Sequence, residues 1–93
     1  MAESVAAHVM ISGKVQGVCF RWETQKVALK NRVQGWVRNL PDGSVEAHFE
    51  GDRDAVSATI DWCRQGPVIS RVENVAIDWK DATGEFDGFQ ITR

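Results

Sequence analysis

The chain has 93 residues, 43% hydrophobic and 26% charged, a balance that predicts one globular domain over residues 1–93 with a single core. Its formal net charge of −2 argues against partners such as nucleic acids or anionic membranes. The N-terminal segment MAESVAAHVM lacks a basic region and apolar runs are short, so we expect a cytoplasmic protein without a signal peptide or transmembrane helix.

The N-terminal part predicts a tail, a strand and a helix. Residues 1–6 are expected to form a flexible tail. In residues 7–12, AHVMIS, apolar and polar side chains alternate, as in a strand with one buried face. From Trp22 onward the period becomes helical. The positions that share one helical face are Phe20, Thr24, Val27, Ala28 and Asn31.

The middle of the chain predicts a β-hairpin. Residues 35–39 and 44–50 read as strands, and LPDG between them is a turn signal, because Pro41 fixes φ and Gly43 tolerates positive φ. Asn39 ends the first of these strands.

The C-terminal half predicts a second helix and one or two further strands. Asp52 or Asp54 can cap the helix, and Gly66 followed by proline is a stop signal. Its apolar stripe contains Val56, Ile60 and Cys63. Residues 72–79 read as a strand, and residues 86–93 close the chain with a short extended piece.

This order of elements predicts an α+β fold, the ferredoxin-like α/β sandwich (βαββαβ). We expect an antiparallel sheet of four to five strands with both helices on one face. In this topology strand 35–39 runs parallel to strand 7–12. Asn39 should therefore lie at the same end of the sheet as the loop that follows the first strand. The fold alone does not determine a function.

The loop GKVQGVCFRW, residues 13–22, is the first candidate site. Gly17 lets the backbone curl until N–H groups converge, and the following helix adds unpaired N–H groups and a partial positive charge. Arg21 adds a fork of donors. These residue types predict an anion site, although no Walker or dinucleotide motif is present. The alternative is a plain connection with Arg21 in a surface ion pair.

Asn39 is the second candidate, because its amide could hold a water molecule near that loop; alternatively it is only a turn residue. Cys19 suggests a thiol phosphatase, but such a site needs cysteine at the start of the loop and arginine at its end. Both cysteines are expected to be reduced, and His8 and His48 to be ordinary strand residues, so no metal site is predicted.

Four stretches together resemble one known family, the acylphosphatases, from about His8 onward. They are SGKVQGVCFRWET, GWVRNLPDGSVEAHFEG, WCRQGP and FDGFQI. The resemblance implies an enzyme that hydrolyses small acyl phosphates to carboxylate and inorganic phosphate without a metal or cofactor, and a monomer is expected. Where the first helix of the family usually ends in Leu-Gly, this chain has Asn31 and Arg32.

The resemblance also implies roles for individual residues. Arg21 would bind the phosphoryl group and Asn39 would position the attacking water. Backbone N–H groups that would bind phosphate belong to Gln16, Gly17, Val18, Cys19 and Phe20. The rival interpretations are a non-catalytic phosphate- or carboxyphosphate-binding module and, more remotely, an RNA-binding ferredoxin-like domain, although the sequence lacks an aromatic-basic stacking pattern.

Overall fold

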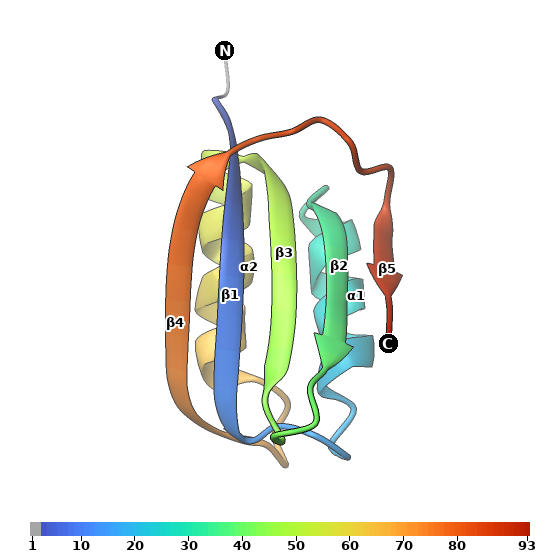
Figure 1. Cartoon of the computed structure of the whole chain (residues 1–93), viewed down its shortest axis with the longest axis vertical. Coiled ribbons are helices and arrows are strands. Elements are labelled where there is room, and N and C mark those ends of the chain that lie inside the picture. The colour runs from blue at the N-terminus through green and yellow to red at the C-terminus, as the bar shows by residue number, and fades with distance from the viewer. Residues whose placement is uncertain (1–2) are drawn as a thin grey trace.

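The computed structural model describes residues 3–93 as a five-stranded sheet with two helices on one of its faces (Figure 1). In chain order the elements are β1 (Ser4–Lys14), α1 (Phe20–Lys30), β2 (Gln34–Asn39), β3 (Val45–Asp52), α2 (Arg53–Gln65), β4 (Arg71–Asp81) and β5 (Phe89–Ile91). The strand order is β4-β1-β3-β2-β5, which confirms the predicted ferredoxin-like fold.

Strand direction brings the two candidate sites together. β3 is antiparallel to both β1 and β2, so β1 and β2 run the same way. The C-terminal end of β2, at Asn39, therefore lies at the end of the sheet where β1 leads into α1, as expected (Figure 1). One pairing differs from the expected antiparallel sheet, because β5 pairs with β2 in parallel. The connection 82–88 crosses the opposite end of the sheet and returns the chain in the direction of β2 (Figure 1).

The predicted tail over residues 1–6 is wrong for its second half. Ser4, Val5 and Ala6 belong to β1, where they pair with β3, and Val5 and Ala6 also pair with β4. Val5 and Ala6 are buried. Their pairing partners are distant in sequence, so a local pattern does not reveal them. Residues 1–2 lie outside the described part of the chain.

Both helices bury one stripe against the sheet, and the core lies between the two layers. α1 begins at Phe20, two residues earlier than the helical pattern indicated, and buries Phe20, Thr24 and Ala28. Asp52 caps α2 by accepting a hydrogen bond from the Asp54 N–H at 3.4 Å. The buried residues of α2 are Val56, Thr59, Ile60 and Cys63. No helix within residues 3–93 combines the length and apolar character needed to cross a bilayer.

Candidate active site

The loop between β1 and α1 is anchored by apolar side chains and bent by two left-handed residues. Val15 and Val18 are buried in the core, whereas Gly17 and Cys19 are exposed. Gly17 has φ = 73° and Cys19 has φ = 63°. A Cβ atom at Gly17 would meet no atom within 4 Å, so the backbone conformation rather than space favours glycine there. Closely spaced left-handed residues can make successive N–H groups converge on an anion.

The N-terminus of α1 leaves its first turn without a side-chain partner. Cys19 is the N-cap residue and makes no side-chain capping hydrogen bond. The first-turn N–H groups and the positive end of the helix dipole therefore remain available to an anion. Cys19 stands at the end of the loop, and only Phe20 separates it from Arg21. The cysteine-first arrangement of a thiol phosphatase is therefore not formed.

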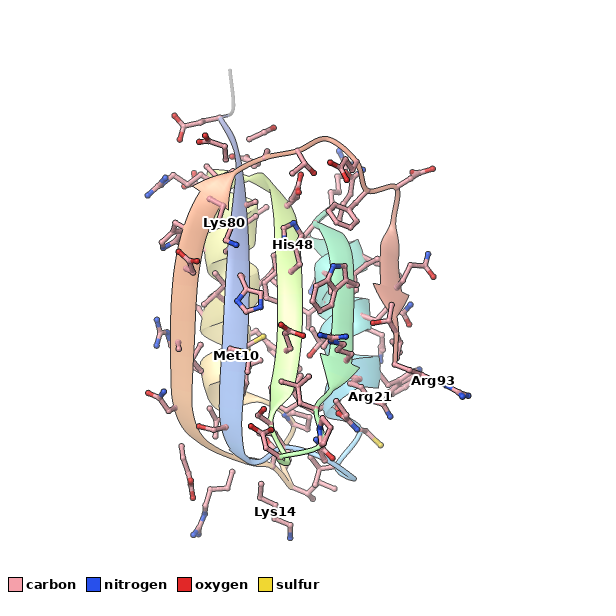
Figure 2. The ribbon with its side chains drawn as sticks, in the orientation of Figure 1. Met10, Lys14, Arg21, His48, Lys80 and Arg93 are labelled. Carbon is pink, nitrogen blue, oxygen red and sulfur yellow. The ribbon has the colours of Figure 1, made fainter. Side chains whose placement is uncertain are left out.

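Arg21 lies in the first turn of α1 and is partly buried. Within residues 3–93 its side chain makes no ion pair or hydrogen bond, so the surface ion pair considered as an alternative is not observed. Figure 2 shows Arg21 at the same end of the sheet as the C-terminal end of β2. The guanidinium group is thus free to bind an anion at this end of the molecule.

Asn39 carries a buried acceptor that no described residue satisfies. Its Oδ1 atom is inaccessible to solvent and has no hydrogen-bond partner within residues 3–93. Such an atom destabilises the folded state by about 1–3 kcal/mol unless a water or ligand pairs with it. The unsatisfied oxygen favours a functional amide at this position.

The turn after Asn39 does not use the Asn39 side chain. The Leu40 N–H donates to the Ser44 carbonyl at 2.9 Å, and the Gly43 N–H donates to the Leu40 carbonyl at 3.1 Å. Asp42 Oδ1 accepts hydrogen bonds from the Ser44 hydroxyl and, at 2.9 Å, from the Ser44 N–H, and these two bonds lower the pKa of Asp42. Because the side chain that bonds within the turn is that of Asp42 and not that of Asn39, a purely structural role for Asn39 loses support.

Gln16 joins the loop to this turn, which the sequence did not indicate. Its Nε2 donates to the Leu40 carbonyl at 2.7 Å and to the Ser44 carbonyl at 2.9 Å. The sequence predicts a role only for the backbone N–H of Gln16. No local signal could reveal the side-chain role, because it depends on two turns meeting in space.

The two histidines and Cys63 belong neither to the loop between β1 and α1 nor to the turn after Asn39. His8 Nε2 lies 2.6 Å from Glu46 Oε2, and His48 Nε2 lies 2.7 Å from Glu50 Oε2. Figure 2 shows His48 on the sheet face opposite the helices. Cys63 is buried, and desolvation raises the pKa of its thiol to about 12. Within the described chain, no cluster of three or more His, Cys, Asp or Glu side chains could hold a metal ion.

Residues 7–91 match the sequence model of the acylphosphatase family. The chain belongs to the acylphosphatase family. It is 56% identical over 85 residues to the acylphosphatase of Pelotomaculum thermopropionicum, covering 91% of this chain and 92% of that protein. The acylphosphatase of Syntrophus aciditrophicus is 57% identical over 84 residues, covering 90% and 88%.

Solved acylphosphatase structures have the same fold. The crystal structure of acylphosphatase from Bacillus subtilis matches with a TM-score of 0.92 and 29% identity, covering 96% of this chain and 99% of that one. As a member of the acylphosphatase family, the chain is an enzyme that hydrolyses small acyl phosphates and releases inorganic phosphate.

Proposed function

We propose that the α1 N-terminal loop, Arg21 and Asn39 carry out this hydrolysis. The phosphoryl group is held by the Arg21 guanidinium and by backbone N–H groups. These belong to Gln16, Gly17, Val18, Cys19 and Phe20. Asn39 holds the attacking water. The unsatisfied, buried Oδ1 of Asn39 is the observation that carries the proposal, because it is an acceptor without a partner at the end of the sheet where the chain enters the uncapped N-terminus of α1 (Figure 1).

The chemistry of an acyl phosphate requires few groups beyond these. Water attacks phosphorus while the bond from phosphorus to the acyl oxygen breaks, and the electron pair leaves with the carboxylate. Because the leaving carboxylic acid has a pKa of about 4, no general acid is needed to protonate it. A proton of the attacking water passes to the phosphate. A loose phosphoryl-transfer transition state needs mainly positioning and neutralisation of the equatorial oxygens.

The absence of a metal requirement is part of this proposal. An assay with acetyl phosphate in excess chelator should give undiminished phosphate release. Hydrolysis of an alkyl phosphate should be slow, because its alkoxide leaving group needs an acid that this arrangement lacks. Loss of turnover in chelator, or equal rates on both substrates, would contradict the mechanism.

The role of Asn39 is tested in the same assay with Asn39→Ala. We expect kcat to fall by about 10²-fold or more, the scale for one well-aligned catalytic hydrogen bond, while the inhibition constant of phosphate stays within a few-fold. Asp42→Ala is the matched control, because it removes the bonds that the Asp42 side chain makes within the same turn and keeps Asn39. It should lower the stability of the turn and leave kcat per folded molecule unchanged. An Asn39→Ala enzyme with wild-type kcat would remove Asn39 from the mechanism.

We also infer a cytoplasmic monomer that binds neither nucleic acids nor membranes. The net charge of −2 supports the absence of polyanionic partners. The exposed, unpaired thiol of Cys19 supports a reducing compartment. A binding module without turnover is disfavoured, because binding alone does not require an amide that orients water.

A further inference from the structure

The Gln16 side chain leaves the phosphate-binding loop and reaches the turn that follows Asn39. Its amide faces two backbone carbonyls, those of Leu40 at 2.7 Å and Ser44 at 2.9 Å. Only the Nε2 end of the amide can donate to both, so these acceptors fix its orientation. The part of the loop that carries the first candidate phosphate-binding N–H is thus attached to the β2–β3 turn.

These two carbonyls close the turn itself. The Ser44 carbonyl already accepts from the Leu40 N–H, and the Leu40 carbonyl from the Gly43 N–H. Gln16 supplies each carbonyl with a second donor. Leu40 directly follows Asn39, and Ser44 precedes Val45, which is the partner of Asn39 in β3. Gln16 therefore holds both arms of the turn next to the pair formed by Asn39 and Val45.

Among the described residues, no other side-chain hydrogen bond joins residues 15–19 to residues 40–44. Val15 and Val18 fix the loop to the core, but apolar contacts are not directional. Two directional bonds from one amide specify the separation of loop and turn more closely.

We propose that Gln16 is a positioning residue, whose side chain sets the distance between the phosphate-binding loop and Asn39. This rests on the roles proposed above for the loop and for Asn39. In-line attack requires the water to approach phosphorus opposite the leaving oxygen. A misplacement of about 1 Å can cost about 10²-fold in rate, so a link between the two groups affects kcat without touching the reacting atoms.

Gln16→Met tests the link, because methionine has a similar length and no donors. We expect kcat for acetyl phosphate to fall about 10-fold or more, while the inhibition constant of phosphate stays within a few-fold. In the Asn39→Ala background the same substitution should cause no further fall in kcat, since the water is already unpositioned. Asp42→Ala, which loosens the turn but keeps the link, should retain kcat.

Gln16→Asn gives a second variant in case the methionine variant does not fold. It keeps both donors on a side chain one methylene shorter, so it should also lower kcat. Thermal unfolding identifies the folded fraction of each protein.

Three results would overturn the positioning role. These are full kcat in folded Gln16→Met, a large weakening of phosphate binding with kcat unchanged, and an equal loss of kcat with or without Asn39. The last would show that Gln16 acts through the loop alone. Wild-type kcat in Asn39→Ala would instead refute the role of Asn39, and the positioning role with it.

Discussion

Arg21 is the single side chain for which the proposed mechanism needs both a positive charge and the planar geometry of a guanidinium group. A guanidinium group presents planar, paired donors to two phosphoryl oxygens, whereas a lysine ammonium acts as a point charge. Arg21 has no partner among residues 3–93 that would have to be displaced by substrate.

Arg21→Gln should weaken inhibition by phosphate and abolish most turnover, and Arg21→Lys should not restore the activity. Arg64→Gln is the matched control, because Arg64 is an exposed arginine on α2 with only a loose contact to Asp61 at 3.8 Å. It should behave as wild type. Phosphate inhibition of normal strength in Arg21→Gln would refute the assignment.

Arg32 occupies a backbone conformation that favours glycine. With φ = 59°, it follows α1 at the position where helices commonly place a left-handed residue. The Val33 N–H donates to the Ala28 carbonyl at 2.8 Å, and the Arg32 N–H donates to the Leu29 carbonyl at 3.1 Å. The helix end is therefore formed without the usual glycine, at the cost of strain in Arg32.

Arg32→Gly should raise stability by about 0.5–1 kcal/mol. The relief of about 1–2 kcal/mol of left-handed strain exceeds the loss of about 0.4–1 kcal/mol from the greater freedom of the unfolded chain. Lys30→Gly, at the last residue of the helix, should instead destabilise, by less than the roughly 1 kcal/mol that glycine costs in a helix interior. Urea unfolding measures both. A destabilised Arg32→Gly would mean that the arginine makes compensating interactions.

At the scale of elements, Glu50 of β3 fastens the connection between β4 and β5. It is buried and accepts hydrogen bonds from the Thr83 N–H at 3.0 Å, the Thr83 hydroxyl at 2.8 Å and the Gly84 N–H at 3.1 Å. His48 lies 2.7 Å from the same carboxylate, and its ring packs against Phe86. Burial alone would raise the pKa of Glu50, but these hydrogen bonds outweigh it and lower the pKa.

The lowered pKa makes this connection sensitive to acid. Ionised Glu50 contributes stability above its ordinary pKa of 4.5, and this contribution is lost as the pH falls through the lower pKa of the folded state. Glu50→Gln should therefore lose about 1–3 kcal/mol at pH 7 but show a smaller further loss on acidification than wild type. Urea unfolding at pH 7 and at about pH 3 measures the difference.

Glu85→Gln serves as the control, because Glu85 is an exposed carboxylate of the same connection. It should match wild type at both pH values. If the stability of Glu50→Gln fell as much on acidification as that of wild type, carboxylates other than Glu50 would be responsible for the loss.

The elements that the sequence predicted best are those with local signals. Asp52 and Gly66 delimit α2, and Pro41 with Gly43 marks the hairpin turn. β5 has only three residues, so its parallel pairing with β2 depends on the path of the connection rather than on its own pattern.

The candidate site was predictable only in part, because some of its contacts join residues that are distant in the sequence. Arg21 and Asn39 carry the resemblance to the family and their joint location follows from strand direction. The side-chain role of Gln16 arises because the loop and the turn meet, and adjacent residues do not indicate it. The unsatisfied oxygen of Asn39 likewise becomes visible only when the surrounding packing is known.

At the scale of the whole molecule, the sheet has two edges, which are protected differently. β5 is short, whereas β4 is long and exposes charged side chains along its length. These are Arg71, Glu73, Asp78, Lys80 and Asp81. Charges on an edge strand oppose pairing with a second molecule.

Replacing both Asp78 and Lys80 by valine should promote association, because it removes one charge of each sign and leaves the net charge at −2. Wild type should remain monomeric in sedimentation velocity at concentrations where this variant forms dimers or larger species. The control replaces Asp61 and Arg64 on α2 by valine, which makes the same chemical change away from the edge. Equal association of both variants would attribute the effect to apolar surface and not to the edge.

The central position of β1 in the sheet determines at which point of its synthesis the chain can become active. Every residue assigned to the site precedes β3, yet β1 is held between β3 and β4, and β4 comprises Arg71–Asp81. On a ribosome adding about 5–20 residues per second, the phosphate-binding loop is made several seconds before the strand that completes its support. We therefore expect nascent chains that end before Arg71 to hydrolyse no acyl phosphate, although they already contain all the residues that the reaction uses.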